Sequence, residues 1–184
     1  MSLTRPFVLA LLGVALAQAG TPGKSVIQRG AYLVSISGCH DCHTPLKMGP
    51  KGPEPDMTRM LSGHPEGLKM PPAPKLAEGP WGWVGSLSMT AFTGPWGVTY
   101  TANLTPDKET GLGSWTEAQF LQMVRTGRHL GQGRRILPPM PIQNLQLVSE
   151  PDLKAIFAYL QSIPAIHNRV PAPIEPAATP IPMH

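Results

Sequence analysis

Both cysteines of the chain lie in one short motif, CHDCH, at positions 39–43. Two cysteines three positions apart, followed directly by a histidine, form the pattern at which c-type haem is attached covalently. On one turn of helix, residues three apart share a face, so Cys39 and Cys42 can meet the two vinyl edges of one porphyrin. The adjacent His43 then places its imidazole under the iron, whereas His40 lies inside the loop. The motif therefore predicts one covalent haem c with His43 as the proximal ligand.

Two other kinds of site use the same residue types. A disulfide redox motif also contains Cys-x-x-Cys, but it belongs to a thioredoxin-like alternation of strands and helices, which this sequence does not show. A zinc site needs further ligands at ordered spacing. The histidines outside the motif are scattered, at His64, His129, His167 and His184. Haem attachment is the interpretation that the motif favours.

The composition limits the classes of protein that the chain can belong to. Its 184 residues include 23 prolines and 19 glycines, and 41% apolar residues suit one modest core. Charged residues make up 14% and aromatic residues 6%, which argues against a basic nucleic-acid-binding module, an acidic tail protein or a coiled coil. Two cysteines exclude a scaffold of several disulfides and a four-thiolate zinc or iron–sulfur site.

The first residues resemble an export signal. Arg5 precedes an uncharged apolar run at positions 7–17, and Ala17-Gln18-Ala19 supplies small residues at alternate positions before Gly20. This pattern predicts a secretory signal peptide cleaved after Ala19. The alternative, a membrane anchor, would need about 20 apolar residues. We therefore expect a periplasmic or otherwise exported protein with no transmembrane span after cleavage.

Three segments carry helical signals. They are residues 24–37, a segment that opens with a Ser114–Glu117 capping box and ends at Gly127, and one that opens at Ser149–Asp152 and ends by Pro164. Residues 44–110 are rich in proline and glycine and are expected to be irregular. Such a long irregular segment is unusual in a compact domain unless it wraps around another group. Residues 165–184 contain five prolines and are expected to form an extended tail. Little core is expected to depend on residues 171–184 within it. The predicted division is a signal peptide at 1–19, one domain at 20–164 and a Pro-rich tail at 165–184.

The second iron ligand must come from outside the motif, and Met140 is the strongest candidate. Prolines at positions 138, 139 and 141 make a stiff extended loop around it. Stiffness suits a weak thioether–iron bond, since a flexible loop would lose the ligand to entropy. Met123 lies on a predicted helix and is expected to fill the core. Other ligands stay open, with Met89 next, His64 or His129 after it, and Met48, Met57, Met60 and Met70 in the irregular segment.

These motifs together resemble a class I c-type cytochrome. The matching blocks are residues 29–33, 39–43, 102–107, 111–115, 137–141 and 153–160. Related blocks occur in cytochrome subunits of periplasmic alcohol and sugar dehydrogenases. The resemblance implies an all-α fold, a small helical bundle around one covalent haem, with a long irregular segment and an extended Pro-rich C-terminal tail.

The resemblance also implies particular contacts. The family's first and last helices cross near a glycine and an aromatic residue, which Gly30 with Phe157 or Tyr159 would supply. The family carries its axial methionine at the position of Met140. The segment after His43 is longer than in the smallest members, which leaves the path of residues 46–100 open.

The function implied is that of an exported monohaem electron carrier with His43 and Met140 as axial ligands, and not an enzyme. A methionine opposite a histidine favours Fe(II) and suits an acceptor of electrons from a dehydrogenase or a respiratory complex. One alternative is a haem c electron-transfer subunit of a periplasmic dehydrogenase complex. Another is a haem enzyme or gas sensor with an open distal site, which carbon monoxide binding would reveal.

Four arginines flank the Met140 loop, at Arg125, Arg128, Arg134 and Arg135. Such a basic patch could contact haem propionates or the acidic surface of a redox partner. The alternative is that these four arginines lie on an ordinary solvent-exposed face and have no binding role.

Overall fold

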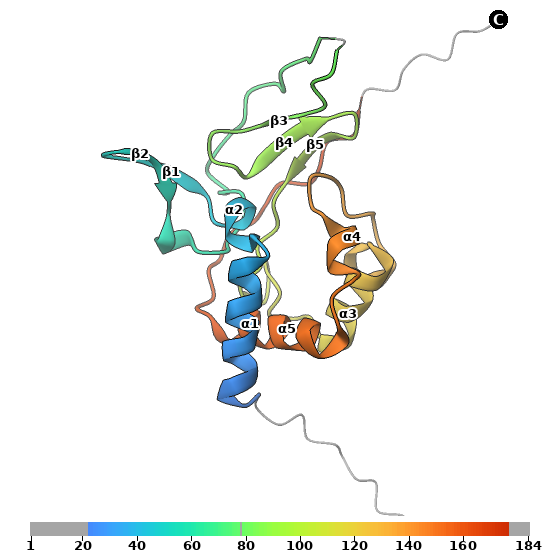
Figure 1. Ribbon diagram of the computed structural model, residues 1–184. Helices are drawn as coiled ribbons and strands as arrows, with labels where there is room; N and C mark the ends of the chain where they lie inside the picture. The colour runs from blue at the N-terminus through green and yellow to red at the C-terminus, as the bar shows by residue number, and fades with distance from the viewer. Residues whose placement is uncertain (1–21, 78, 177–184) are drawn as a thin grey trace, which may run out of the picture.

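The computed structural model describes residues 22–77 and 79–176 (Figure 1). The signal peptide predicted for residues 1–19 lies outside these residues. The helices described are α1 (Lys24–Ile36), α2 (Cys39–His43), η1 (Met57–Arg59), α3 (Glu117–Thr126), η2 (His129–Gly131), α4 (Ile142–Leu145) and α5 (Glu150–Ser162). The strands described are β1 (Leu46–Gly49), β2 (Gly52–Pro55), β3 (Val84–Gly85), β4 (Ala91–Gly94) and β5 (Gly97–Tyr100). None of the helices in this part of the chain combines the length and the apolar character that a membrane crossing requires.

Helices α1 and α5 cross at Gly30. A Cβ atom at this position would collide with the backbone carbonyl of Ala155 and would lie 2.8 Å from the Cβ of Tyr159. Glycine is required here because only a residue without a side chain lets the two backbones approach so closely. The predicted crossing of the first and last helices at Gly30 is confirmed, with Tyr159 as its aromatic partner.

The helix boundaries follow local capping signals. The Ser149 hydroxyl accepts a hydrogen bond from the Asp152 amide at the start of α5, as predicted. The capping box of α3 is formed by Thr116 and Gln119, so the prediction of a Ser114–Glu117 box is wrong by two residues. Threonine and glutamine satisfy the same backbone amides as serine and glutamate, so both pairs fit the sequence pattern.

The core lies between α1, α3 and α5. Val34, Val124 and Leu153, one from each helix, are fully buried. The rings of Phe120 and Phe157 lie 5.2 Å apart, centroid to centroid, across the contact of α3 with α5. These side chains hold the two ends of the chain together around one apolar centre.

The prediction of an all-α class I cytochrome bundle is wrong for this structure, because two small antiparallel sheets occupy part of the segment expected to be irregular. One sheet pairs β1 with β2, and the other has the order β3-β4-β5. Figure 1 shows the three-stranded sheet above α2, away from the contact of α1 with α5. Phe92 on β4 is buried, and Gly97 at the start of β5 adopts a φ of +90°, which glycine tolerates. The fold therefore combines helices with short hairpins.

The segment that follows α5 is extended and packs on the domain. Asn168 is fully buried, and its Nδ2 donates hydrogen bonds to the carbonyls of Ser62 and His64 at 2.7 and 2.9 Å. Ile174 and Val98 exchange two backbone hydrogen bonds of 2.8 and 2.9 Å. Asn168 therefore fixes the first part of the predicted tail to the domain, because its amide serves carbonyls that water cannot reach. Residues 177–184 of the predicted tail lie outside the described residues.

Candidate haem site

Helix α2 consists of the CHDCH motif alone and follows α1 after a sharp turn. Gly38 makes this turn with a φ of +67°, and a Cβ atom there would lie 2.9 Å from Oδ2 of Asp41. Because the motif forms one helical turn, Cys39 and Cys42 share a face, as expected from their spacing. His43 is the last residue of the turn.

His43 is held by a backbone group far along the chain. Its Nδ1 lies 2.8 Å from the carbonyl oxygen of Ala102, and the side chain is buried. A carbonyl can only accept, so Nδ1 carries the proton and Nε2 keeps its lone pair. Burial, the largest cause, lowers the pKa of His43 despite this hydrogen bond, so the ring is neutral at pH 7. A neutral imidazole anchored through Nδ1 is the form in which histidine binds a metal.

The two thiols are not joined in a disulfide. Burial raises the pKa of Cys39 to about 11, and burial with the nearby Asp41 carboxylate also raises the pKa of Cys42. Thiol–disulfide catalysts need the opposite shift, toward a stable thiolate. In residues 22–77 and 79–176, no three His, Cys, Asp or Glu side chains cluster as metal ligands. The site therefore does not match the redox-disulfide or the zinc alternative.

This donor set fits a covalently bound haem. One turn of helix presents two thiols on one face and one oriented, neutral imidazole beside them. The thiols have the number and spacing for two thioether bonds to one porphyrin, and the imidazole has a nitrogen available for iron. His40 is engaged elsewhere, since its Nδ1 lies 3.1 Å from the Thr44 hydroxyl.

Met140 lies directly before α4, on a different part of the fold. Its carbonyl accepts a hydrogen bond of 2.8 Å from the Ile142 amide, and its side chain is half-buried. Ile142 is buried and anchors this end of the loop. In the view of Figure 1, α4 lies to the right of α2, and α5 lies below both. That Met140 binds the iron stays a prediction.

The other candidate iron ligands have different surroundings in the structure. His64 cannot offer a ring nitrogen, because its Nε2 donates to the Leu68 carbonyl and its Nδ1 accepts from the Thr90 hydroxyl, each at 3.0 Å. Met123 packs against the core, which confirms its predicted role as core filler. Met89 sits in a turn with a φ of +55°, and His129 lies edge-on to Trp115 with ring centroids 5.1 Å apart. The remaining methionines divide into one packed on the core, Met60, and three exposed ones, Met48, Met57 and Met70.

Sequence reasoning missed the residues that position the Ala102 carbonyl. Asn103 is buried, and its Oδ1 accepts from the Thr105 amide at 3.0 Å while its Nδ2 donates to the Ile166 carbonyl at 2.8 Å. Gly63 has a φ of +77°, and a Cβ atom there would collide with the carbonyl oxygen of Ala102. The Asn-x-Thr turn was a usable signal, since asparagine side chains close such turns on their own backbone.

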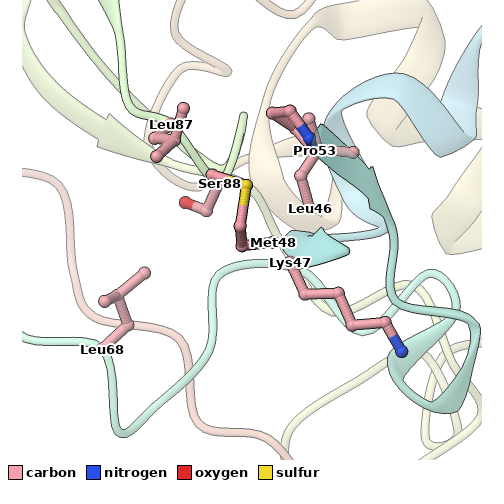
Figure 2. A pocket seen from close by; sticks show the side chains of 7 residues that line it. All are labelled: Leu46, Lys47, Met48, Pro53, Leu68, Leu87 and Ser88. Carbon is pink, nitrogen blue, oxygen red and sulfur yellow. The ribbon is translucent and has the colours of Figure 1, made fainter. Parts of the chain in front are cut away.

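A separate apolar pocket lies beside β1 and β2 (Figure 2). It has a volume of about 220 Å³ and is lined by Leu46, Lys47, Met48, Pro53, Leu68, Leu87 and Ser88. Cys39, Cys42, His43 and Met140 do not line it, so it is distinct from the candidate haem site.

Comparisons with known proteins agree with the motif. No family model matches the chain. The quinone alcohol dehydrogenase cytochrome c subunit of Gluconacetobacter polyoxogenes is 28% identical over 81% of this chain and 24% of its own length. The gluconate 2-dehydrogenase cytochrome c subunit of Pantoea cypripedii is 28% identical over 83% of this chain and 26% of its own length. The fructose dehydrogenase cytochrome subunit of Gluconobacter japonicus is 30% identical over 74% of this chain and 21% of its own length.

The chain spans about a quarter of the length of these relatives, and the matches cover most of the chain itself. The resemblance to c-type cytochromes is confirmed: this chain is similar, over most of its length, to the cytochrome c subunits of alcohol, gluconate and fructose dehydrogenases.

Proposed function

We propose that this protein is an exported carrier of single electrons with one haem c, attached through Cys39 and Cys42. His43 is the proximal iron ligand and Met140 the distal one. The protein performs no bond chemistry of its own. Its redox partners are a dehydrogenase or a respiratory complex.

The observation that carries this proposal is the arrangement of α2. Two free thiols share one helical turn with His43, whose Nδ1 is fixed at 2.8 Å from the Ala102 carbonyl. Bound haem supplies reversible exchange of one electron at its iron. Cys39 and Cys42 hold the group, and His43 presents Nε2 in a fixed orientation. With haem bound, the role of Met140 would be to exclude water and small molecules from the iron.

A redox titration of the purified exported protein tests this function. We expect one iron per chain, a one-electron reversible transition, and no change in the reduced spectrum under carbon monoxide. Carbon monoxide binding to the unmodified reduced protein would instead indicate the haem enzyme or gas sensor. More than one haem per chain would also contradict the proposal, because the sequence contains one CHDCH motif.

A second candidate is an electron-transfer subunit of a dehydrogenase complex. The relatives favour it, since each is a cytochrome subunit of a dehydrogenase. Size-exclusion chromatography of the native exported fraction separates the two functions. Elution of the haem with a dehydrogenase activity, at a mass far above 19.7 kDa, supports the subunit, and elution as a free small protein supports the carrier.

A further inference from the structure

The net charge of the chain is concentrated on one segment. The chain has 15 Lys and Arg residues against 11 Asp and Glu residues. Residues 118–149 hold four of the basic residues and none of the acidic ones, so 11 charges of each sign remain elsewhere. The four are Arg125, Arg128, Arg134 and Arg135. The segment that also carries Met140 therefore has a charge of +4, equal to the net charge of the whole chain.

The structure gathers these arginines, which we call the arginine surface. Arg128 and Arg135 pair as an antiparallel β-bridge, and the His129 amide donates to the Arg134 carbonyl at 2.9 Å. Residues 128–135 thus form a short closed loop that begins two residues after α3. Arg125 lies in the last turn of α3, directly before this loop.

Backbone carbonyls, not carboxylates, hold the guanidinium groups. Arg128 donates to the Gly133 carbonyl at 3.0 Å, and Arg125 donates to the Val148 carbonyl at 2.9 Å. The ion pairs of residues 22–77 and 79–176 involve other cations, namely Arg29, Lys47, Lys154 and His167. A carbonyl orients a guanidinium without neutralising it, so Arg128 keeps its charge. Arg125 also lies near the Glu150 carboxylate, whose pKa its charge helps to lower, so the surface is least compensated at Arg128, Arg134 and Arg135.

The arginine surface adjoins the predicted distal ligand. A polar pocket of about 240 Å³ lies between the arginines and α4, with Arg128, Arg135 and Ile142 in its lining. The amide of Ile142 donates to the carbonyl of Met140. A partner bound to this surface would sit beside the Met140 loop. Electron transfer slows steeply with distance, so this position is favourable for it.

We propose that the arginine surface docks the acidic face of a redox partner protein. This inference rests on the proposed function, and it adds the chemical character of the partner. Arginine pairs with carboxylates through two parallel hydrogen bonds, and opposite charge accelerates encounter by about 10- to 1,000-fold. A membrane surface is a poorer fit, because membrane-bound helices expose an apolar face. Here the apolar residues Phe120, Val124 and Ile142 of α3 and α4 are buried in the protein.

Stopped-flow kinetics with an acidic blue-copper protein as the oxidant tests the inference. The test variant is Arg134→Gln with Arg135→Gln, and the matched control is Lys51→Gln with Lys75→Gln, which removes the same charge elsewhere. All four side chains are exposed. At low ionic strength we expect the test variant to react about three- to tenfold more slowly than the unmodified protein, with the difference lost at high salt. The control should change by less than twofold.

Several outcomes would overturn the inference. Equal losses in both variants would show that net charge alone matters, and no loss in the test variant would remove any role for the surface. A rate unaffected by Arg134→Gln with Arg135→Gln, together with lost binding to phosphatidylglycerol vesicles, would assign the surface to a membrane. The haem spectrum of each variant is recorded first. If the unmodified protein contains no haem, the proposed function is refuted. If the test variant has a normal haem spectrum and an unchanged rate, only the docking surface is refuted.

Discussion

The Nδ1 atom of His43 lies 2.8 Å from the carbonyl oxygen of Ala102, 59 residues further along the chain. This contact joins α2 to the far end of the long segment that contains both sheets. The amide of Gly63 donates to the His43 carbonyl at 2.8 Å, so the backbone of this turn is tied down as well. The orientation of the His43 imidazole therefore depends on how residues 44–101 fold.

Gly63→Ala should destabilise the holoprotein by about 2–4 kcal/mol. The substitution forces an L side chain to a φ of +77° and drives a Cβ atom against the carbonyls of Thr101 and Ala102. Urea unfolding followed at the haem absorption band measures the loss. Gly67→Ala is the control, because a Cβ atom there meets nothing within 4 Å. Equal stability of the two variants would show that Gly63 does not hold the Ala102 loop.

Asn168→Ala should lower the free energy of unfolding by about 2–4 kcal/mol. It removes the donor to the buried Ser62 and His64 carbonyls and the Oδ1 acceptor that serves Arg59 and the Glu66 amide. Chemical denaturation of the purified holoprotein measures the change. The exposed Asn144→Ala should stay within about 0.5 kcal/mol of the unmodified protein. A neutral effect of Asn168→Ala would mean that the segment after α5 contributes no stability.

His64 should make the fold weaken as the pH falls from 7 to 5. Burial lowers the pKa of His64 from its ordinary value of 6.5, so the unfolded chain takes up a proton first and the free energy of unfolding decreases over this range. Above pH 7 both states are neutral at His64 and the contribution is constant. Urea denaturation at pH 7.5 and pH 5 measures the loss, and His64→Gln should reduce it. The same loss in both proteins would assign the pH dependence to another group.

The parts of this fold that depend on local sequence signals are predictable, and the parts that depend on long-range backbone contacts are not. The Ser149 cap of α5 and the turn at Gly38 depend on neighbouring residues, so the sequence alone predicts them. The hairpin of β4 and β5 was also readable, because Phe92, Val98 and Tyr100 surround a Gly-Pro-Trp-Gly turn. The strand β2 was not, since Gly and Pro are poor strand formers and only pairing with β1 orders it.

The residues of the candidate site also differ in how far the sequence predicts them. Cys39, Cys42 and His43 stand out because their chemistry depends on spacing over five positions. The Ala102 carbonyl leaves no signature, because every residue carries one. Gly63 and Asn103 act by placing that backbone group, which becomes visible only when residues 44–101 are folded.

Met140→Ala should open one side of the iron while His43 and the thioethers still hold the haem. The oxidised protein should become high-spin or take up another ligand, the sulfur-to-iron charge-transfer band should disappear, and the reduced protein should bind carbon monoxide. The reduction potential should fall, because methionine ligation raises it. Absorption spectra and a redox titration measure these changes. Met89→Ala and Met123→Ala are the controls, and loss of the band in Met89→Ala alone would move the ligand to the turn before β4.

Haem staining of the denatured protein tests whether Cys39 and Cys42 carry the haem covalently. Thioether bonds survive denaturation, so a stained band is expected for the unmodified protein and none for the double variant Cys39→Ser with Cys42→Ser. A His43→Gly variant should keep covalent haem if attachment still occurs, but its spectrum should change because the proximal nitrogen is lost. An unstained band from the unmodified exported protein, or a stained band from the double serine variant, would contradict the account.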